Sequence, residues 1–296
     1  MRITSFSIFN QLTRSLQENL RKLGVYSDRL SSGKSINKPS DDVSGMVSSM
    51  DYKISINEIE QYKKNIDDAD SFLGMTDTIM GSVYNQLDRA RELAVRAAND
   101  SLEPEDRVSI SKEIENLRDE VMRLSQTKLR DRYIFSGYKT DTVPFDGTFT
   151  YQGNSSEIEV FIDRDSTMAI NVSGDEAFSY GGETFMETLD DLYNALNDID
   201  PDAARAGAQT AIDKIEDAIT QIANVRATVG AKMSRLENLQ SSLDDRSLTF
   251  NTLLSNTQDA DLADTVTQIS KIQGALESLR ASGSKVISQS LLDFLG

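Results

Sequence analysis

The chain contains no cysteine, no histidine and no tryptophan, and it has only four prolines in 296 residues. Without cysteine or histidine it cannot build Cys or Ser–His nucleophiles, zinc fingers, HExxH protease sites, or haem and iron–sulfur centres ligated by those residues. The absence of cysteine also means that disulfides cannot indicate the redox compartment. No apolar run reaches membrane-spanning length and no secretory signal pattern is visible, so the residues alone predict a cytoplasmic protein.

Positive charge is also scarce. The chain carries 31 basic and 48 acidic side chains, a formal net charge of −17. Nucleic-acid binding needs Lys and Arg to replace phosphate counterions, and anionic membrane surfaces attract the same residues. We therefore expect neither nucleic acid nor a membrane as a partner. The length allows two or three domains with a hydrophobic core.

Apolar residues at alternating spacings of three and four predict a helix at each end of the chain. The N-terminal seam comprises Phe9, Leu12, Leu16, Asn19, Leu23, Tyr26 and Leu30. The C-terminal seam comprises Leu262, Ile269, Ile272, Leu276, Leu279 and Val286, and it is interrupted at Gly283. Narrow stripes of this kind are typical of helices that pair with each other.

Helical spacing also fills most of the chain between these ends. One pattern runs without a break from Ile59 to Ala97, and Pro104 fits the first turn of the next helix. Asp200 and Pro201 predict a cap and a first helical position for a third long segment. From about 131 to 184 the residue pattern is no longer helical. Residues 156–163 and 168–172 are predicted to form strands, with turns at glycines between them.

The order is therefore helices, a β-rich insert, and helices again, which suggests a chain that runs out and returns. We expect a mainly α fold: a long antiparallel helical rod or coiled coil formed by the two halves, with a small β-rich inserted domain. An ordinary helical bundle is the simpler alternative. Against it, Leu20, Ile287, Leu291 and Phe294 lie off the terminal seam, and a lone helix pair cannot cover them. We infer that partner subunits do.

Several motifs suggest catalysis or ligand binding, but each lacks an essential part. The run Gly33-Lys34-Ser35 resembles the end of a phosphate-binding loop, yet Asp28 stands where the first Gly is required. Asp198, Asp200 and Asp202 open like a calcium loop without its later Gly and Glu, so helix capping is the better interpretation. Adjacent Asp pairs point about 100° apart on a helix and do not form acid–base dyads. We expect no enzyme activity, no cofactor and no metal.

A specific resemblance begins in the link after the first helix. The segment 30–42 reads Leu30-Ser31-Ser32-Gly33-Lys34-Ser35-Ile36-Asn37-Lys38-Pro39-Ser40-Asp41-Asp42. It resembles the N-terminal signature of the bacterial flagellin family, with Gly33, Asn37, Pro39, Asp41 and Asp42 as the distinctive positions. Further similarities follow in order at 65–69, at 89–100 with Arg89 and Glu92, and at 259–263 with Asp261. They cover about 1–140 and 185–296.

The middle of the chain is similar to the family members that join the flagellar hook to the filament. The positions on which this similarity rests are Phe135, Gly137, Pro144 and Phe145. Similar runs at 151–154 and 171–178 and the ending 291–295 support it. Val43 and Ala177 depart from the usual residues of the family without changing this resemblance.

The resemblance implies a structural protein that self-assembles through its terminal helices between hook and filament. Its implied partners are further copies of itself, a hook-side hook-associated protein, flagellin and an export chaperone. It also implies secretion through the flagellar export apparatus, which replaces the cytoplasmic prediction. The expected divisions are a terminal coiled coil (1–40 with 257–296), a helical rod (41–130 with 185–256) and a solvent-facing insert (131–184).

The expected assembly interface combines seam and off-seam residues of the two terminal helices. It consists of Phe9, Leu12, Leu16, Leu20, Leu23, Leu30, Ile269, Ile272, Leu276, Leu279, Val286, Ile287, Leu291 and Phe294.

Two other functions remain open at this point. The first is filament flagellin itself, which differs mainly in the middle of the chain. The second is a carbohydrate-binding β domain on a helical stalk. Its sugar site would draw on Tyr133, Phe135, Tyr138, Phe149, Tyr151, Phe161 and Tyr180.

Overall fold

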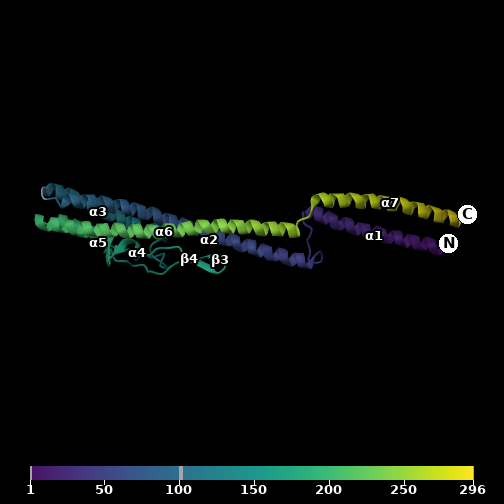
Figure 1. Ribbon diagram of the computed structural model, residues 1–296, viewed down its shortest axis with the longest axis horizontal. Helices are drawn as coiled ribbons and strands as arrows, with labels where there is room; N and C mark the ends of the chain where they lie inside the picture. Colours follow the sequence, from purple (N-terminus) through teal and green to yellow (C-terminus); the bar gives the residue numbers. More distant parts are fainter. Residues whose placement is uncertain (1, 100–102, 296) are drawn as a thin grey trace. The chain divides into compact units, whose positions relative to one another are not determined.

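The computed structural model describes residues 2–99 and 103–295, and the side chains of 7–99 and 103–285. It forms two compact units, Met1–Asn57 with Asp245–Gly296, and Glu58–Asp244. The helices α2 (Val43–Ala97) and α6 (Pro201–Gln258) contribute residues to both. The expectation of a mainly helical chain with a small β-rich insert is confirmed (Figure 1).

The first unit contains the two terminal helices, α1 (Arg2–Ser32) and α7 (Leu262–Leu295), which pack side by side (Figure 1). They run antiparallel, because Lys34 pairs with Asp259 at one end while Leu12 lies against Gly283 further along. A Cβ on Gly283 would lie 2.7 Å from Cδ2 of Leu12. The glycine that interrupts the predicted seam is therefore a point of close helix approach.

The second unit contains the rest of α2 and α6, together with α3 (Pro104–Ser125) and α5 (Phe185–Leu196). Ion pairs set the register of α2 against α6: Lys63 with Asp244, Asp77 with Arg226, and Arg91 with Glu216. From the first pair to the last the register advances 28 residues along α2 and retreats 28 along α6, as antiparallel helices require. Their shared core is a run of fully buried aliphatic side chains that includes Leu73, Val83 and Ile222.

The helices α3 and α6 begin at the prolines and capping residues predicted from the sequence. Pro104 and Pro201 occupy the first helical positions of α3 and α6. The carboxylate of Asp200 accepts the backbone N–H of Asp202 at 3.0 Å, which makes it the cap of α6. Asp198 likewise accepts the N–H of Asp200, so the aspartates that resemble a calcium loop act as turn and cap residues.

The β-rich part of the chain consists, among the described residues, of three separate two-stranded antiparallel ribbons, the first of which begins just before the insert predicted at 131–184. They are β1 (Lys128–Leu129) with β2 (Arg132–Tyr133), β3 (Glu159–Asp163) with β4 (Ser166–Ala169), and β5 (Ser179–Tyr180) with β6 (Glu183–Thr184). The paired strands β3 and β4 are shorter than the predicted 156–163 and 168–172, and a five-residue helix α4 (Gly174–Phe178) follows them. Ribbons this small need another core, and buried aromatic rings supply it.

That core centres on Phe178. Its ring lies 4.9 Å from Phe135, 5.7 Å from Phe145 and 6.3 Å from Phe185, measured between centroids. The two closest contacts are edge-to-face, a favoured arrangement of aromatic pairs. The hydroxyl of Tyr151 donates to the carbonyl of Phe135 at 2.8 Å, and burial raises the pKa of that hydroxyl.

Candidate assembly surface

The terminal helix pair buries its predicted seam unevenly. Ile272 and Leu276 on α7 are buried, at 8% and 6% exposure. A second group is only half buried: Leu12, Leu16, Leu23, Ile269 and Leu279. Phe9, Leu20 and Leu30 are more than 40% exposed. The pair therefore covers part of its apolar surface and leaves the rest open.

Four predicted interface residues receive no side-chain description. Val286, Ile287, Leu291 and Phe294 lie outside the residues whose side chains the structure describes. Their place in the interface stays a prediction from the sequence.

A second apolar stripe, which the sequence reasoning missed, lies at the start of α2. Val43, Val47, Met50 and Ile54 are exposed by 68%, 56%, 54% and 54%. Their spacing of four, three and four places them on one face of the helix. The spacing is present in the sequence, but the helical pattern predicted there begins only at Ile59, after the stripe ends.

This stripe is unusual because α2 already has an inward face at the same level. Ser49 and Ile56 are buried, and Tyr52 stacks near Phe250 of α6 with ring centroids 6.2 Å apart. At 100° per residue, the exposed stripe lies roughly 160° around the helix from these inward residues. The helix is thus apolar on two opposite sides, and the structure leaves one of them uncovered.

The segment 33–42, which connects α1 to α2, forms an ordered joint. Gly33 adopts φ +69°, a left-handed conformation that ends α1, as expected for a glycine in this position. Its carbonyl accepts the N–H of Ala260 at 2.9 Å, and Ser35 N–H donates to the carbonyl of Gln258 at 2.7 Å. Gln258 is buried, and its amide donates back to the carbonyl of Ile36. These bonds fasten the joint to the connection between α6 and α7.

Asp41 closes the other half of the joint. Its carboxylate accepts the backbone N–H groups of Asn37 at 3.0 Å and Lys38 at 2.9 Å, and these bonds lower the pKa of Asp41. Asp42 accepts the N–H of Gly45 and so caps α2. A Cβ on Gly45 would lie 2.5 Å from Cδ1 of the buried Ile36, so this glycine lets the joint pack against the helix.

The remaining signature residues also have structural roles. Arg89 bridges α2 to α3 by donating to Glu113, and it also pairs with Glu92, each at 2.7–2.8 Å. Asp261 accepts the N–H of Asp264 and caps α7. Phe145 and Pro144 are buried, with Phe145 in the aromatic core of the insert.

Most of the aromatic rings considered for a sugar-binding site in the insert are occupied by contacts within the protein. Phe135 is fully buried, and Tyr151 is held by its hydrogen bond. Tyr133 lies under the ammonium group of Lys128, and Phe149 lies under the guanidinium of Arg118. Of the candidate rings, Tyr138, Phe161 and Tyr180 are the ones that are strongly exposed.

The described residues contain no group of three or more Asp, Glu, His or Cys side chains placed to hold a metal ion. The helices in this part of the chain include none that is long and apolar enough to cross a membrane.

Each unit contains a pair of antiparallel helices: α1 with α7 in the first, and α2 with α6 in the second, which also holds the β-rich insert. Residues 3–140 match the family model described as the bacterial flagellin N-terminal helical region, and residues 212–295 match that of the C-terminal helical region. The chain belongs to the bacterial flagellin family.

Known proteins of the flagellum are similar along most of the chain. Flagellar hook-associated protein 3 of Escherichia coli K12 is 27% identical over 299 residues, which is 94% of each chain. A solved structure of a putative flagellar hook-associated protein from Vibrio parahaemolyticus superposes with a TM-score of 0.70 at 22% identity, over 74% of this chain and 100% of that one. The flagellar junction protein FlgL from Legionella pneumophila gives 0.60 at 19% identity, over 73% and 100%. The two structures support the fold.

Proposed function

We propose that this chain is a structural subunit of the bacterial flagellum and forms the junction between hook and filament. The observation that carries the proposal is the open apolar surface on helices whose other side is already packed. Full burial of a large apolar side chain contributes about 1.5–3 kcal/mol, so half-exposed residues leave roughly half of that unused in a single copy. Neighbouring subunits can provide the missing cover.

The proposed interface has two parts. One is the surface of the α1–α7 pair, with Phe9, Leu20 and Leu30 as its exposed members and the four C-terminal residues as predicted additions. The other is the stripe from Val43 to Ile54 on α2. The buried Ile272 and Leu276 hold the pair together and so support the surface indirectly.

We retain the three-part division as a proposal: 1–40 with 257–296 as the inner coiled coil, 41–130 with 185–256 as the rod, and 131–184 as the solvent-facing insert. In this reading the signature residues around Asp41 form the joint between coiled coil and rod. The proposed partners are further copies of the chain, a hook-side hook-associated protein, flagellin and an export chaperone. The proposed location is the flagellum outside the cell. The relative from Escherichia coli, named as hook-associated and similar over 94% of both chains, supports this choice.

Filament flagellin is the competing function within the family, and assembly behaviour separates the two. Purified protein should stay monomeric alone and add a short layer to isolated hooks that carry the hook-side partner, as seen by electron microscopy. Long filaments from the purified protein alone would favour flagellin instead.

Leu276→Asp tests the role of the terminal pair in the same assay. It places an uncompensated carboxylate at a buried position and should prevent addition to hooks. Circular dichroism should retain most of the helical signal, because the residues of Glu58–Asp244 do not depend on this contact. Loss of all helicity would contradict this separation of roles.

A further inference from the structure

Two-electron oxidation has few possible targets in this chain. The chain contains no cysteine, histidine or tryptophan, so the thioethers of its nine methionines are the side chains most reactive toward peroxides. Met50 on α2 is 54% exposed, and it is the one exposed methionine among the described side chains. The remaining described methionines are buried or half-buried. A peroxide in solution therefore reaches the sulfur of Met50 most readily.

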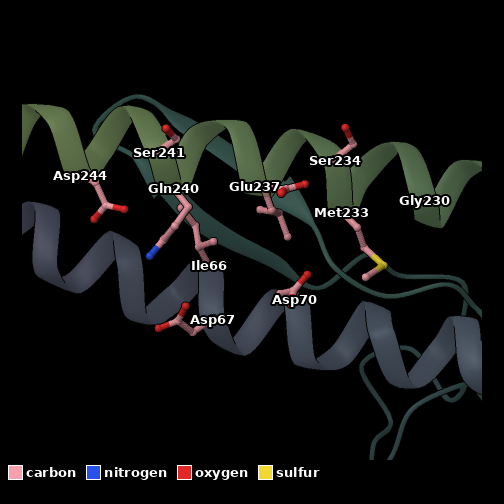
Figure 2. A pocket seen from close by; sticks show the side chains of 11 residues that line it. Ile66, Asp67, Asp70, Gly230, Met233, Ser234, Glu237, Gln240, Ser241 and Asp244 are labelled. Atoms are coloured by element: carbon pink, nitrogen blue, oxygen red, sulfur yellow. The ribbon is translucent and has the colours of Figure 1, made fainter.

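Two half-buried methionines are useful comparisons. Sδ of Met46, one turn earlier on α2, lies 3.9 Å from the hydroxyl oxygen of the buried Ser49. Met233 lines a solvent-open pocket of about 810 Å³ between α2 and α6, and Figure 2 shows its side chain pointing toward α2. Met233 belongs to Glu58–Asp244, whereas Met50 belongs to the unit that carries the proposed interface. Met233 is therefore a partly accessible sulfur outside that interface.

Met50 lies within the exposed apolar stripe of α2. Val47 precedes it by three residues and Ile54 follows it by four, so the three side chains adjoin on one face of the helix. A flexible, apolar thioether suits a contact surface of this kind. Its sulfoxide carries a polar oxygen that needs a hydrogen-bond donor once it is buried, and the aliphatic side chains of Val47 and Ile54 supply none. Oxidation therefore converts the stripe from a surface that gains by burial into one that loses by it.

We propose that Met50 is a modification site, and that its oxidation by a peroxide in the free subunit prevents the subunit from assembling. This inference rests on the proposed function, because the stripe around Met50 is one of the two surfaces that a neighbouring copy would cover. The reverse also follows: a subunit that has already assembled shields Met50 from peroxide.

The reaction needs only the thioether and hydrogen peroxide. A lone pair of the Met50 sulfur attacks one peroxide oxygen, the O–O bond breaks and an S–O bond forms. The second oxygen takes the proton of the transferred oxygen and leaves as water. The sulfur is oxidised by two electrons and the peroxide is reduced by two. Methionine sulfoxide reductase, supplied with a thiol reductant, reverses the change, so the modification acts as a switch and not as permanent damage.

Peptide mass spectrometry after brief treatment with hydrogen peroxide locates the modification. In the full-length free protein, Met50 should gain one oxygen about tenfold faster or more than the fully buried Met80 and Met186. In protein already added to hook ends, oxidation of Met50 should slow by about fivefold or more, while Met233 should keep its rate. The second comparison shows whether a neighbouring copy covers the stripe.

The effect on assembly is measured with peroxide-treated protein, after catalase has removed the peroxide, on hook ends that carry the hook-side partner. Addition should fall about tenfold or more, and reductase treatment should restore it. Met50→Leu keeps an apolar side chain without sulfur, so it should add normally before and after peroxide. Met233→Leu is the matched control and should remain as sensitive as the unmodified protein. Met50→Gln places a polar group in the stripe and should add poorly without any peroxide, with the helical signal in circular dichroism unchanged.

The outcomes separate this switch from the proposed function. Normal addition of protein whose Met50 is fully oxidised would overturn the switch and leave the junction role standing. Equal loss of addition by peroxide-treated Met50→Leu protein would also overturn it, because another residue would then be responsible. Failure of the untreated protein to add to hook ends would overturn the proposed function, and this inference with it.

Discussion

Truncation of Leu276 to alanine would measure how strongly the two terminal helices hold each other. Leu276 is 6% exposed and is, with Ile272, one of the two buried hydrophobic residues that α7 contributes to the described seam. Leu→Ala in a core costs 2–5 kcal/mol, and a site between only two helices can relax, so we expect about 2–3 kcal/mol. Because the pair can open locally, this loss should appear as opening of α1 from α7 and not as global unfolding.

Hydrogen exchange measured by mass spectrometry on the full chain resolves this difference. A loss of 2–3 kcal/mol accelerates exchange through the open state by about 30–150-fold at 25 °C. We expect this acceleration in peptides of α1 and α7, with no change in peptides from Glu58–Asp244. Val266→Ala on the same helix is the matched control, because its side chain is 48% exposed and should cost less than about 1 kcal/mol.

Two results would refute this reasoning. Equal acceleration in both units would mean that they unfold as one. Acceleration below about fivefold in α1 would mean that Leu276 does not hold the pair, despite its burial.

Three further predictions concern the joint, the insert and the rod. The folded-state pKa of Asp41 is lowered, so the stabilisation that it gives the joint is present above the unfolded pKa of about 3.9 and is lost as pH falls through the folded pKa. The protection factors of the two backbone amides that donate to Asp41, relative to their intrinsic exchange rates at each pH, should therefore fall in acid when followed by NMR, and Asp41→Asn should remove most of that fall. Gly137→Ala should destabilise the insert by more than about 2 kcal/mol, because Gly137 has φ +61° and a Cβ would collide with the carbonyl of Asn154; an unchanged thermal transition followed by near-ultraviolet circular dichroism would contradict this. Arg226→Met should change the free energy of unfolding in urea by less than about 1 kcal/mol, because its ion pair with Asp77 is about 40% exposed on both sides, and a loss above 2 kcal/mol would show that the pair matters more than its exposure implies.

Much of the helical architecture follows from local sequence. A 3.6-residue apolar period, prolines at the first turns of α3 and α6, and aspartate caps act within a few residues of each other, so they can be read without knowing the fold. The continuous α2, the start of α6 at Pro201 and the end of α1 at Gly33 were all predictable for this reason. The strands were less predictable than the helices, because β3 and β4 pair over only part of the apolar segments from which strands were predicted.

The functional surface was only partly predictable. The terminal seams could be recognised by spacing, but spacing does not tell how deeply a seam residue is buried: Leu276 is buried, whereas Phe9 is 46% exposed. The stripe from Val43 to Ile54 has the same spacing as a buried seam, and only the positions of neighbouring helices leave it exposed. The pocket lined by Ile66, Met233 and Gln240 likewise brings together residues about 170 positions apart in sequence, a relation that no local pattern contains.

The sequence by itself determined that this chain is helical, that its ends pair, and that it belongs among the flagellins. Each of these properties depends on short-range spacing or on runs of specific residues. The tertiary structure decided which apolar faces are covered, how Asp41 and Gln258 fasten the joint, and that the buried Oε1 of Gln240 has no donor. Those properties depend on which distant segments meet, and burial and hydrogen-bond partners arise only at that stage.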